Sequence, residues 1–573
     1  MVTDNTDIAE AFCEFYTDIG PNLAKNVSSP PTGSFRDFLG PRCSNSIFFA
    51  PTTPMEIESL CQALDISKGP GHDDIAPAIL RFVSFEIADP LSKLINACFQ
   101  AGHFPESWKI ARVIPLFKQG DPTDVGNYRP ISVLSVFSKI FERLLQRRIT
   151  SFLSKQNSIL DTQYGFRQGH STYMAVMDMV ESIRLSWEKG EHCLGIFIDY
   201  RKAFDTVDHS ILLAKLEHIG IRGMPLELIK SYLDKRKQFV SFRGAESIQR
   251  NISVGVPQGS ILGPLFFLIY VNDMSRASSV LKHILFADDT NEFTSNKSRD
   301  SLYSTTNIEL KKVSNWVAHN KLTLNYEKTE FIEFNKSFNA PSDSHVLKID
   351  GKCIRKVEQS KFLGVHIDKK ISWRPHIHKI ITKVSQTIGI IGRAKAFMNE
   401  AQLAMLYNTM VLPHLQYCLI NWGNFRLDLN IRLRNKLLNL QKCLVRIICS
   451  TDRIAHADPL FNRLNALKID DLYEQAIRIF SYKLSRNLLP QGISCMFIKT
   501  SHAHVTRNAK RNLFVMRSDK RSIKSIAPKC WNSLPLEIKK SPSISSFKAK
   551  SKTSFIDTYG AFSCQVKHCK SCP

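Results

Sequence analysis

The sequence Leu285-Phe286-Ala287-Asp288-Asp289 places two adjacent carboxylates directly after an apolar run that begins at His283. The run Asp288-Asp289-Thr290-Asn291 is typical of a tight turn, and Glu292-Phe293 begins a candidate return strand. The pattern therefore predicts a short hairpin with Asp288 and Asp289 at its turn. An isolated Asp-Asp pair usually forms nothing more than such a turn, so its meaning depends on the rest of the chain.

A second apolar run, Cys193 to Ile198, ends at Asp199. Because the run is continuously apolar rather than alternating, it predicts a strand buried on both faces. A charged side chain at the tip of such a strand is costly unless water or a cation meets it. If the two strands are neighbours, Asp199, Asp288 and Asp289 repel one another. A hard divalent ion with oxygen ligands would relieve that repulsion.

A third signal is the segment from Asn251 to Leu265, which contains Pro257-Gln258-Gly259-Ser260 and runs into an apolar stretch. Glycine in a turn lets the backbone approach a planar or phosphorylated ligand closely. We therefore predict a ligand-facing turn followed by a helix. The apolar run Leu265 to Val271 is too short to span a membrane and is interpreted as protein core.

In this order the three signals resemble the motifs of reverse transcriptases: Phe197 to Asp205, Pro257 to Ser260, and Phe286 to Asp289. Within that family the chain is most similar to non-long-terminal-repeat (LINE-type) retrotransposons, particularly the jockey-like elements. Further motifs of those elements are matched by Val113 to Lys118, Asn127 to Ser132, Gln163 to Thr172, Asn320 to Asn325 and Phe362 to Gly364. The resemblance covers residues 55–375.

The resemblance implies an α+β right-hand polymerase with fingers, a palm built on an antiparallel sheet, a helical thumb, and a basic, mainly helical C-terminal region. The domains expected from it are an N-terminal connector (1–50), an N-terminal segment with the fingers (51–190), a palm with finger insertions (191–372), a helical thumb (373–450) and the basic C-terminal region (451–573). The endonuclease domain that precedes the connector in complete elements is expected to be missing.

The resemblance also implies roles for single residues. Asp199 and Asp288 would be the metal ligands, and Asp289 would complete the catalytic acidic cluster. Phe204 lies where the family places a side chain beneath the incoming sugar, so its ring would exclude a ribose 2′-hydroxyl. Simple core packing is the competing interpretation of this phenylalanine.

Three basic residues and one turn are implied to bind substrate. Lys118 and Arg129 match positions that contact the triphosphate, where arginine can clamp phosphate bidentately and lysine supplies a point charge. Gln258 and Gly259 are expected beside the nascent base pair and template strand. Lys328 matches a lysine suggested to protonate the departing pyrophosphate, although a solvated lysine after a strand is also ordinary.

Charge indicates the kind of partner. The 573 residues carry 77 Lys and Arg against 52 Asp and Glu, a net charge of +25. This excess favours a polyanion such as nucleic acid over a small neutral substrate, although membrane or ribosome contact can also select a basic surface. Residues 501–573 hold fifteen basic against three acidic side chains, so binding through this region would weaken steeply with salt.

We therefore expect RNA-directed DNA synthesis that uses Mg²⁺, with Mn²⁺ as a substitute, and that is primed at its target. The expected partners are an RNA template, a DNA primer or nicked target DNA, deoxynucleoside triphosphates and a separate endonuclease. Two alternatives stay open at this point. One is a catalytically idle nucleic-acid-binding remnant of a transposon, and the other is a DNA-templated polymerase.

The remaining patterns concern location and local structure. Fourteen scattered cysteines and a polar N-terminus predict a reduced intracellular protein of nucleus and cytoplasm, neither secreted nor membrane-bound. The close spacing of Cys and His over Cys564 to Cys572 favours a disordered basic tail over a zinc site. Apolar periodicity predicts helices over residues 7–28, 54–64, 379–397, 401–412 and 433–448.

Overall fold

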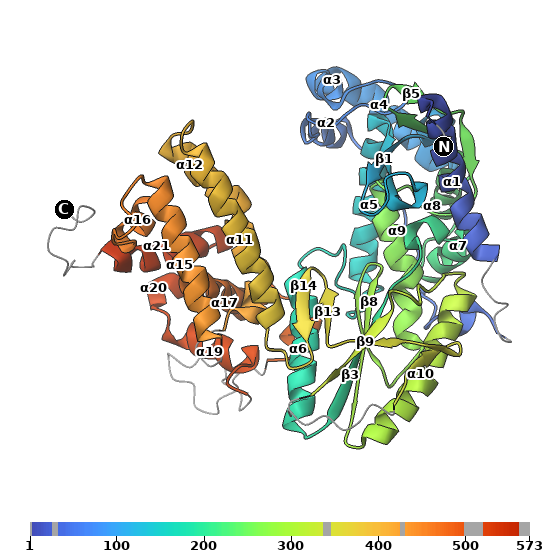
Figure 1. Cartoon of the computed structure of the whole chain (residues 1–573). Coiled ribbons are helices and arrows are strands. Elements are labelled where there is room, and N and C mark those ends of the chain that lie inside the picture. Colours follow the sequence, from blue (N-terminus) through green and yellow to red (C-terminus); the bar gives the residue numbers. More distant parts are fainter. Residues whose placement is uncertain (1–2, 26–32, 336–344, 425–429, 498–518, 561–573) are drawn as a thin grey trace.

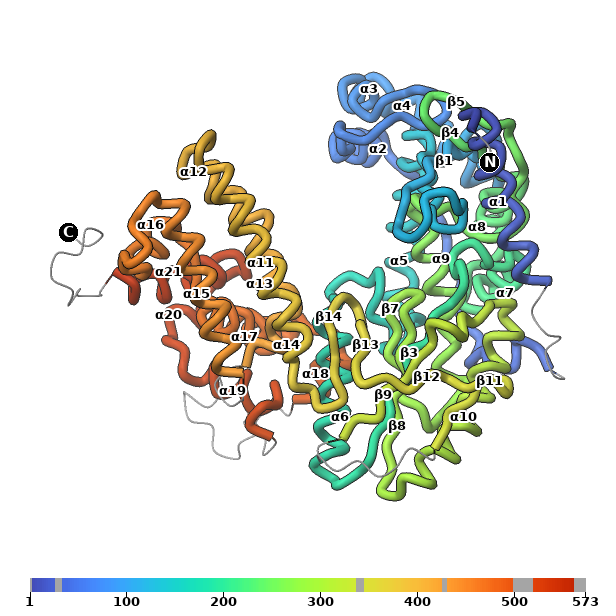
Figure 2. The backbone as a smooth tube through the Cα atoms, viewed as in Figure 1, coloured from blue at the N-terminus to red at the C-terminus, as the bar shows by residue number. Residues whose placement is uncertain are grey.

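The computed structural model describes residues 3–25, 33–335, 345–424, 430–497 and 519–560. Figure 1 shows two lobes, a larger one that holds both five-stranded sheets and a helical one made of α11 to α21. The backbone trace in Figure 2 shows that they meet near α6 and the β13–β14 hairpin. The expected mixture of helices and sheets is confirmed.

The larger lobe begins with helices and one hairpin. These elements are α1 (Asn5–Lys25), α2 (Pro54–Gln62), α3 (Pro77–Phe82), α4 (Ser84–Ala101), β1 (Ile110–Phe117), β2 (Tyr128–Leu134), α5 (Val136–Lys155) and α6 (Thr172–Glu188). Helix α1 packs on the first sheet, where Phe12 and Cys13 share a small apolar cluster with Val113 and Val240.

The rest of the larger lobe alternates strands with helices. Its elements are β3 (His192–Ile198), the 3₁₀ helix η4 (Ala203–Thr206), α7 (His209–His218), α8 (Met224–Leu233), β4 (Arg236–Phe242), β5 (Ala245–Glu246), β6 (Arg250–Ile252), α9 (Leu262–Val271), β7 (Lys282–Phe286), β8 (Asp289–Asn296), α10 (Arg299–His319), β9 (Glu330–Phe334), β10 (Lys348–Ile349), β11 (Lys352–Cys353), β12 (Arg355–Lys356), β13 (Gln359–Phe362) and β14 (Val365–Asp368).

The second lobe is helical. It contains α11 (Arg374–Ala394), α12 (Glu400–Met410), α13 (Leu412–Gln416), α14 (Leu419–Trp422), α15 (Ile431–Ile448), α16 (Asp458–Arg463), α17 (Ile469–Ser485), α18 (Gln491–Ser494), α19 (Ile523–Ser533), α20 (Leu536–Lys539) and α21 (Ile544–Gly560). One apolar core joins these helices to α6 and β14, so the second lobe is anchored to the first by continuous packing.

The two large sheets differ in their place along the chain. The first has the order β2-β1-β4-β5, with β6 also paired to β4. The second has the order β12-β9-β3-β8-β7, and β3 pairs antiparallel with both β8 and β9. Because β3 is central in this sheet and covered on both faces, its continuously apolar run is accounted for.

Helices are confirmed at the five expected places, with the fourth divided into α12 and α13. The end of the first expected helix, residues 26–28, lies outside the described residues, and α11 ends at Ala394, three residues before the expected end. The segment from Leu265 to Val271 is entirely buried within α9, as expected of core. The cysteine-rich stretch Cys564 to Cys572 lies outside the described residues. Among the residues that are described, none of the helices has the length and apolar character needed to cross a membrane.

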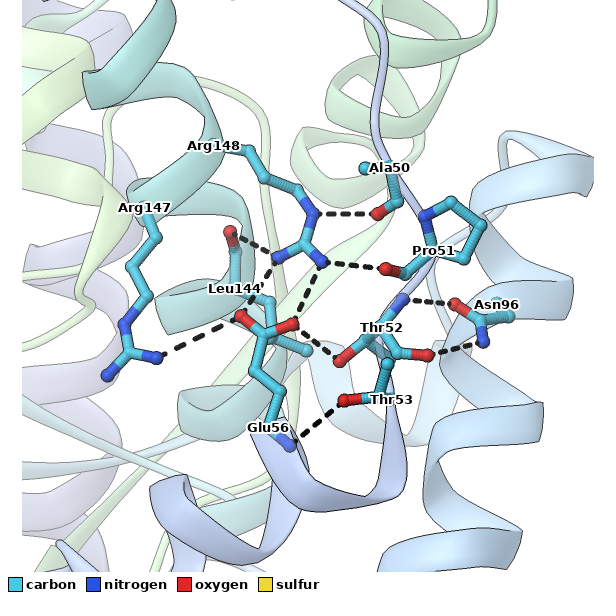
Figure 3. Close-up of polar contacts among 9 residues, drawn as sticks. All are labelled: Ala50, Pro51, Thr52, Thr53, Glu56, Asn96, Leu144, Arg147 and Arg148. Atoms are coloured by element: carbon cyan, nitrogen blue, oxygen red, sulfur yellow. Dashed lines mark hydrogen bonds and ion pairs between the residues drawn. The ribbon is translucent and has the colours of Figure 1, made fainter.

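A polar network fastens the chain before α2 to helix α5 (Figure 3). The Arg148 guanidinium donates to the carbonyl of Ala50 at 2.8 Å, to that of Pro51 at 3.3 Å and to the Glu56 carboxylate at 3.0 Å. Burial raises the pKa of Glu56, but hydrogen bonds from Arg148 and Thr52 outweigh it and hold that pKa below its usual value. Arg148 is thus the central residue of this network, and it holds the segment before α2 against α5.

Replacing Arg148 by alanine should lower the free energy of unfolding by about 2–3 kcal/mol, because two carbonyls and a carboxylate lose their donor in a half-buried site. Urea unfolding at pH 7, followed by tryptophan fluorescence, measures the change. Arg147→Ala is the matched control, since Arg147 lies 3.9 Å from Glu56 and is 53% exposed. Arg147→Ala should lower the free energy of unfolding by less than about 0.5 kcal/mol. Equal losses in the two variants would contradict the central role of Arg148.

Candidate active site

Asp199 follows the last residue of the central strand β3 and is held there by the segment after α10. Asn325 Nδ2 donates to Asp199 Oδ2 at 2.8 Å, and its backbone N–H donates to the Asp199 carbonyl at 2.9 Å. The Thr329 hydroxyl accepts from the Asp199 N–H at 3.3 Å. These three contacts fix both the backbone and the carboxylate of Asp199.

The β7–β8 hairpin is tighter than predicted. Its turn contains only Ala287 and Asp288, because Asp289 already pairs with Phe286 as the first residue of β8. The prediction that both aspartates lie in the turn is therefore wrong for Asp289. Ala287 has φ +56°, and a positive φ at the first of two loop residues matches a type II′ turn.

Strand pairing brings the three carboxylates into one region. Ile198 is paired with Thr290, so Asp199 and Asp289 each lie one residue beyond this pair, on adjacent strands. Partial removal from water raises the pKa of Asp289 to about 6, with further contributions from the charges of Asp288 and Asp199. Partial removal from water also raises the pKa of Asp288, and the charge of Asp199 adds to it. The three predicted acidic residues thus form one electrostatic cluster.

Basic side chains from another sheet face this cluster. Lys118 follows β1, and Arg129 lies in the paired strand β2. Partial removal from water lowers the pKa of Lys118, and the charges of Arg129 and Lys328 lower it further, while Asp199 opposes the shift. All three predicted basic residues therefore lie within electrostatic range of one another, beside the acidic cluster.

The turn containing Gln258 is joined to η4. Gln258 Nε2 donates to both oxygens of Asp205 at 2.9 Å, and the Gln258 carbonyl accepts from the Ser132 N–H of β2 at 2.8 Å. Gly259 has φ +134°, and a Cβ at this position would lie 2.4 Å from the Ser132 carbonyl oxygen. The conformation and the close approach both require glycine here.

Phe204 lies in η4 beside this turn and is half-buried. Its carbonyl accepts from the Val256 N–H at 2.9 Å. Its ring stacks on Phe267 of α9 with centroids 4.5 Å apart. The ring therefore has a packing partner, and the part that stays accessible is available to a ligand.

Sequence reasoning assigned no role to three further residues of this region. Burial raises the pKa of Asp205 to about 6, although Gln258 and Lys202 both oppose the rise. Lys202 stands among Asp205, Lys328 and Arg129. Both Asp205 and Lys202 lie within the quoted motif Phe197 to Asp205, so the motif was the available signal for them.

The third is Glu142 of α5. Its buried carboxylate accepts from the Ile261 N–H at 2.6 Å and the Leu262 N–H at 3.2 Å. It thereby caps the start of α9 directly after the Gln258 turn. The local sequence around Glu142 does not predict this contact, because its partners are more than a hundred residues away.

The donor chemistry of the acidic cluster fits a hard divalent cation, since all its side-chain donors are oxygens whose mutual repulsion such an ion would relieve. Within the described ranges, no three His, Cys, Asp or Glu side chains already stand close enough together to hold an ion. The acidic cluster thus has the negative charge and the oxygen ligands that suit a cation, but its side chains do not stand close enough together to hold one.

Comparison with known sequences agrees with the order of the motifs. Residues 117–367 match the family described as reverse transcriptase (RNA-dependent DNA polymerase). The "Probable RNA-directed DNA polymerase from transposon BS" of Drosophila melanogaster is 28% identical over 465 residues, which cover 77% of this chain and 50% of the relative.

Two further relatives carry the name "RNA-directed DNA polymerase from mobile element jockey". The one from Drosophila melanogaster is 30% identical over 66% of this chain and 42% of its own length. The one from Drosophila funebris is 27% identical over 81% of this chain and 51% of its own length. The chain thus spans about half the length of these curated relatives.

Partial removal of Asp289 from water, together with the repulsion from Asp288 and Asp199, predicts a pH-dependent gain in stability from Asp289→Asn. The pKa of Asp289 is higher in the folded protein than its usual value, so wild-type stability falls as the pH rises through about 6. At pH 7.5 with EDTA, Asp289→Asn should raise the melting temperature by about 1–2 °C, an effect reduced by solvent screening. At pH 5 the difference should be clearly smaller, because Asp289 is largely protonated in the folded protein there, and it should vanish only below the ordinary carboxyl pKa of 3.8.

Differential scanning fluorimetry at the two pH values measures this effect. Asp234→Asn, which changes an exposed carboxylate after α8, is the control and should change neither melting temperature. A stabilisation by Asp289→Asn that is as large at pH 5 as at pH 7.5 would show that charge repulsion is not its cause.

Proposed function

Residues 117–367 belong to the reverse transcriptase family, and from this premise we propose that the chain is an RNA-directed DNA polymerase of a non-long-terminal-repeat retrotransposon. The observation that carries the proposal is the acidic cluster of Asp199, Asp288 and Asp289, which lies inside the matched region beside Lys118 and Arg129. Carboxylates facing basic side chains in this way suit a triphosphate that is bound together with cations.

The reaction is attack of a primer 3′-hydroxyl on the α-phosphorus of a deoxynucleoside triphosphate, with departure of pyrophosphate. Asp199 and Asp288 would hold the cations, and Asp289 would keep the cluster in shape. Divalent ions such as Mg²⁺, or Mn²⁺ in its place, would supply neutralisation of the charge that develops on the attacking and leaving oxygens. The protein's own contribution is mainly positioning and electrostatic stabilisation.

The basic residues bind the triphosphate. Arg129 clamps phosphate oxygens, and Lys118 supplies a compact charge beside them. Partial burial and the neighbouring positive charges lower the pKa of Lys118, and a bound polyphosphate would offset both effects. Lys328, which is exposed and stands near Lys118, is positioned to give a proton to the departing pyrophosphate.

Gln258 and Gly259 contact the nascent base pair and the template. The bond from Gln258 to both oxygens of Asp205 orients the turn, and Gly259 keeps the turn against β2. Phe204 lies beneath the sugar, where its accessible edge meets the 2′ position. Its stacking on Phe267 makes the ring rigid, which is what steric exclusion of a hydroxyl requires.

We assign the sheet of β12, β9, β3, β8 and β7 to the palm. The other large sheet, which contains β1, β2, β4, β5 and β6, is assigned to the fingers. The thumb begins with α11, whose exposed face carries Lys379, Lys383 and Arg393. Gly389 and Gly392 of the same helix also face open space. Such a surface suits the backbone of a nucleic-acid duplex.

The proposed template is the element's own RNA, which the relatives' names support because they describe mobile elements and a transposon. Priming at a nick in the target DNA is proposed from the resemblance of the motifs alone. A DNA-templated polymerase and an idle nucleic-acid-binding remnant are the alternatives that the experiment must separate.

Primer extension on poly(rA)/oligo(dT), with Mg²⁺ or Mn²⁺ and beside a matched DNA template, tests the proposal. The wild type should incorporate deoxythymidine on RNA, and Asp288→Asn should lose on the order of 10²–10³-fold in rate, since a ligand carboxylate is removed. Asp234→Asn should retain full activity. Extension on DNA alone favours the DNA-templated polymerase, and duplex binding without extension under either metal favours the remnant.

Phe204→Val tests the sugar gate. Removing the ring should reduce the preference for deoxynucleotides over ribonucleotides by about 10- to 100-fold, the range that one steric contact supplies. Single-nucleotide incorporation kinetics with dTTP and UTP measure the ratio, and Phe85→Val, at a residue of helix α4 that is 75% exposed, is the control. Unchanged discrimination together with a lower melting temperature would assign Phe204 to core packing alone.

A further inference from the structure

The segment from Thr162 to Gly165 extends the palm sheet at its edge. The order of that sheet leaves one side of β7 without a strand. Along this side the Tyr164 N–H donates to the Leu285 carbonyl at 2.7 Å, and the Leu285 N–H donates to the Thr162 carbonyl at 2.9 Å. Gln163 itself forms a parallel bridge with Leu285. The segment therefore grips β7 three residues before Asp288.

The Gln163 side chain reaches from this segment to the turn. Its Oε1 accepts from the Ala287 N–H at 3.0 Å and from the Gly165 N–H at 2.8 Å. The residue is only 1% exposed. In this position it cannot contact template or nucleotide.

Ala287 is the point where the turn needs support. It has φ +56°, which costs a residue with a Cβ about 1 kcal/mol or more. A backbone conformation of this kind persists when the surrounding contacts determine it. The hydrogen bond from Ala287 to Gln163 Oε1 is such a contact, and the next residue along the chain is Asp288.

The close backbone approach at Gly165 and the contacts of Tyr164 make this support of the turn rigid. A Cβ at Gly165 would lie 2.5 Å from the Ala287 nitrogen, so glycine is what lets the two backbones meet. On the other side of Gln163, the Tyr164 hydroxyl donates to Asp178 of α6 at 3.0 Å, and Asp178 also pairs with Lys282 of β7. Helix α6, the segment and β7 are thus tied together.

The nitrogen of the Gln163 side-chain amide differs from the oxygen in its hydrogen bonding. Gln163 Nε2 is buried and has no hydrogen-bond partner among the described residues. An unpaired buried donor destabilises a fold. Its presence indicates that glutamine is kept at this position for its acceptor oxygen, which serves the turn, rather than for overall stability.

We propose that Gln163 is a positioning residue that sets the Ala287–Asp288 turn and thereby aims the Asp288 and Asp289 carboxylates. The last step rests on the proposed function, because it takes these carboxylates as the ligands of the catalytic cations. The hold on the turn itself does not depend on that function.

Two variants separate the acceptor from the bulk of the side chain. Gln163→Met keeps a side chain of similar length without an acceptor, and Gln163→Glu keeps an oxygen that can accept from both N–H groups. Gln168→Ala, at an exposed glutamine of the same stretch, is the matched control. Circular dichroism and melting temperature establish that each variant is folded.

Hydrogen exchange measured by mass spectrometry on the apo protein tests the hold on the turn. Peptides that cover residues 160–168 and 283–290 should exchange at least about tenfold faster at the protected amides in Gln163→Met, and should stay protected in Gln163→Glu and Gln168→Ala. Unchanged protection in Gln163→Met would overturn the proposal, whether or not the wild type is active.

Steady-state primer extension tests the consequence for the carboxylates. Gln163→Met should lower kcat by about 10- to 100-fold and raise the Mg²⁺ concentration needed for half-maximal rate, with KM for dTTP nearly unchanged. Partial recovery in Gln163→Glu is expected. Faster exchange in Gln163→Met without any change in kcat or in the Mg²⁺ requirement would overturn the aiming role. An inactive wild type would refute the proposed function alone.

Discussion

The antiparallel pairing of β3 with β8 is the constraint on which the rest of the site depends. It brings the end of a fully buried strand next to the start of another, and each end carries a carboxylate. The pairing concentrates like charges in a partly buried place. Removal from water and, after it, the neighbouring carboxylates raise the pKa values of Asp288 and Asp289. Backbone hydrogen bonds and the apolar core beneath the sheet hold the cluster together against this repulsion.

Buried polar side chains then fix the loops that surround the cluster. Asn325 holds Asp199, Gln163 holds Ala287, and Glu142 holds the start of α9 after the Gln258 turn. Each uses a side-chain amide or carboxylate to satisfy or orient groups on a distant segment. In a low-dielectric interior such bonds are directional and hard to replace, so they determine loop conformation more sharply than apolar packing does.

A group of basic side chains borders the acidic cluster. Lys118, Arg129, Lys202 and Lys328 gather beside the acidic residues, where partial burial and mutual repulsion lower the pKa of Lys118 and of Lys202. The mutual repulsion of these basic side chains disfavours their charged forms in the folded protein. The proposed binding of cations and phosphates would relieve the repulsion among the acidic residues and among the basic residues together.

Much of this arrangement was accessible from the sequence. The continuous apolar run before Asp199 determined a central strand, the Asp-Asp pair after β7 determined a hairpin, and the glycine-rich turn determined the start of α9. The order of these motifs also predicted the family that residues 117–367 match. Such features are local, because they depend on periodicity, turn chemistry and the conformational freedom of glycine.

Only the tertiary structure decided which residues meet across long separations in the chain. The two-residue turn, with Asp289 already paired in β8, follows from the register with Phe286, and no turn rule distinguishes it from a longer loop. The roles of Gln163 and Glu142 depend on partners more than a hundred residues away. The sequence determined which side chains could perform the chemistry, and strand pairing together with buried hydrogen bonds decided where they stand, because those contacts form only once the chain has folded.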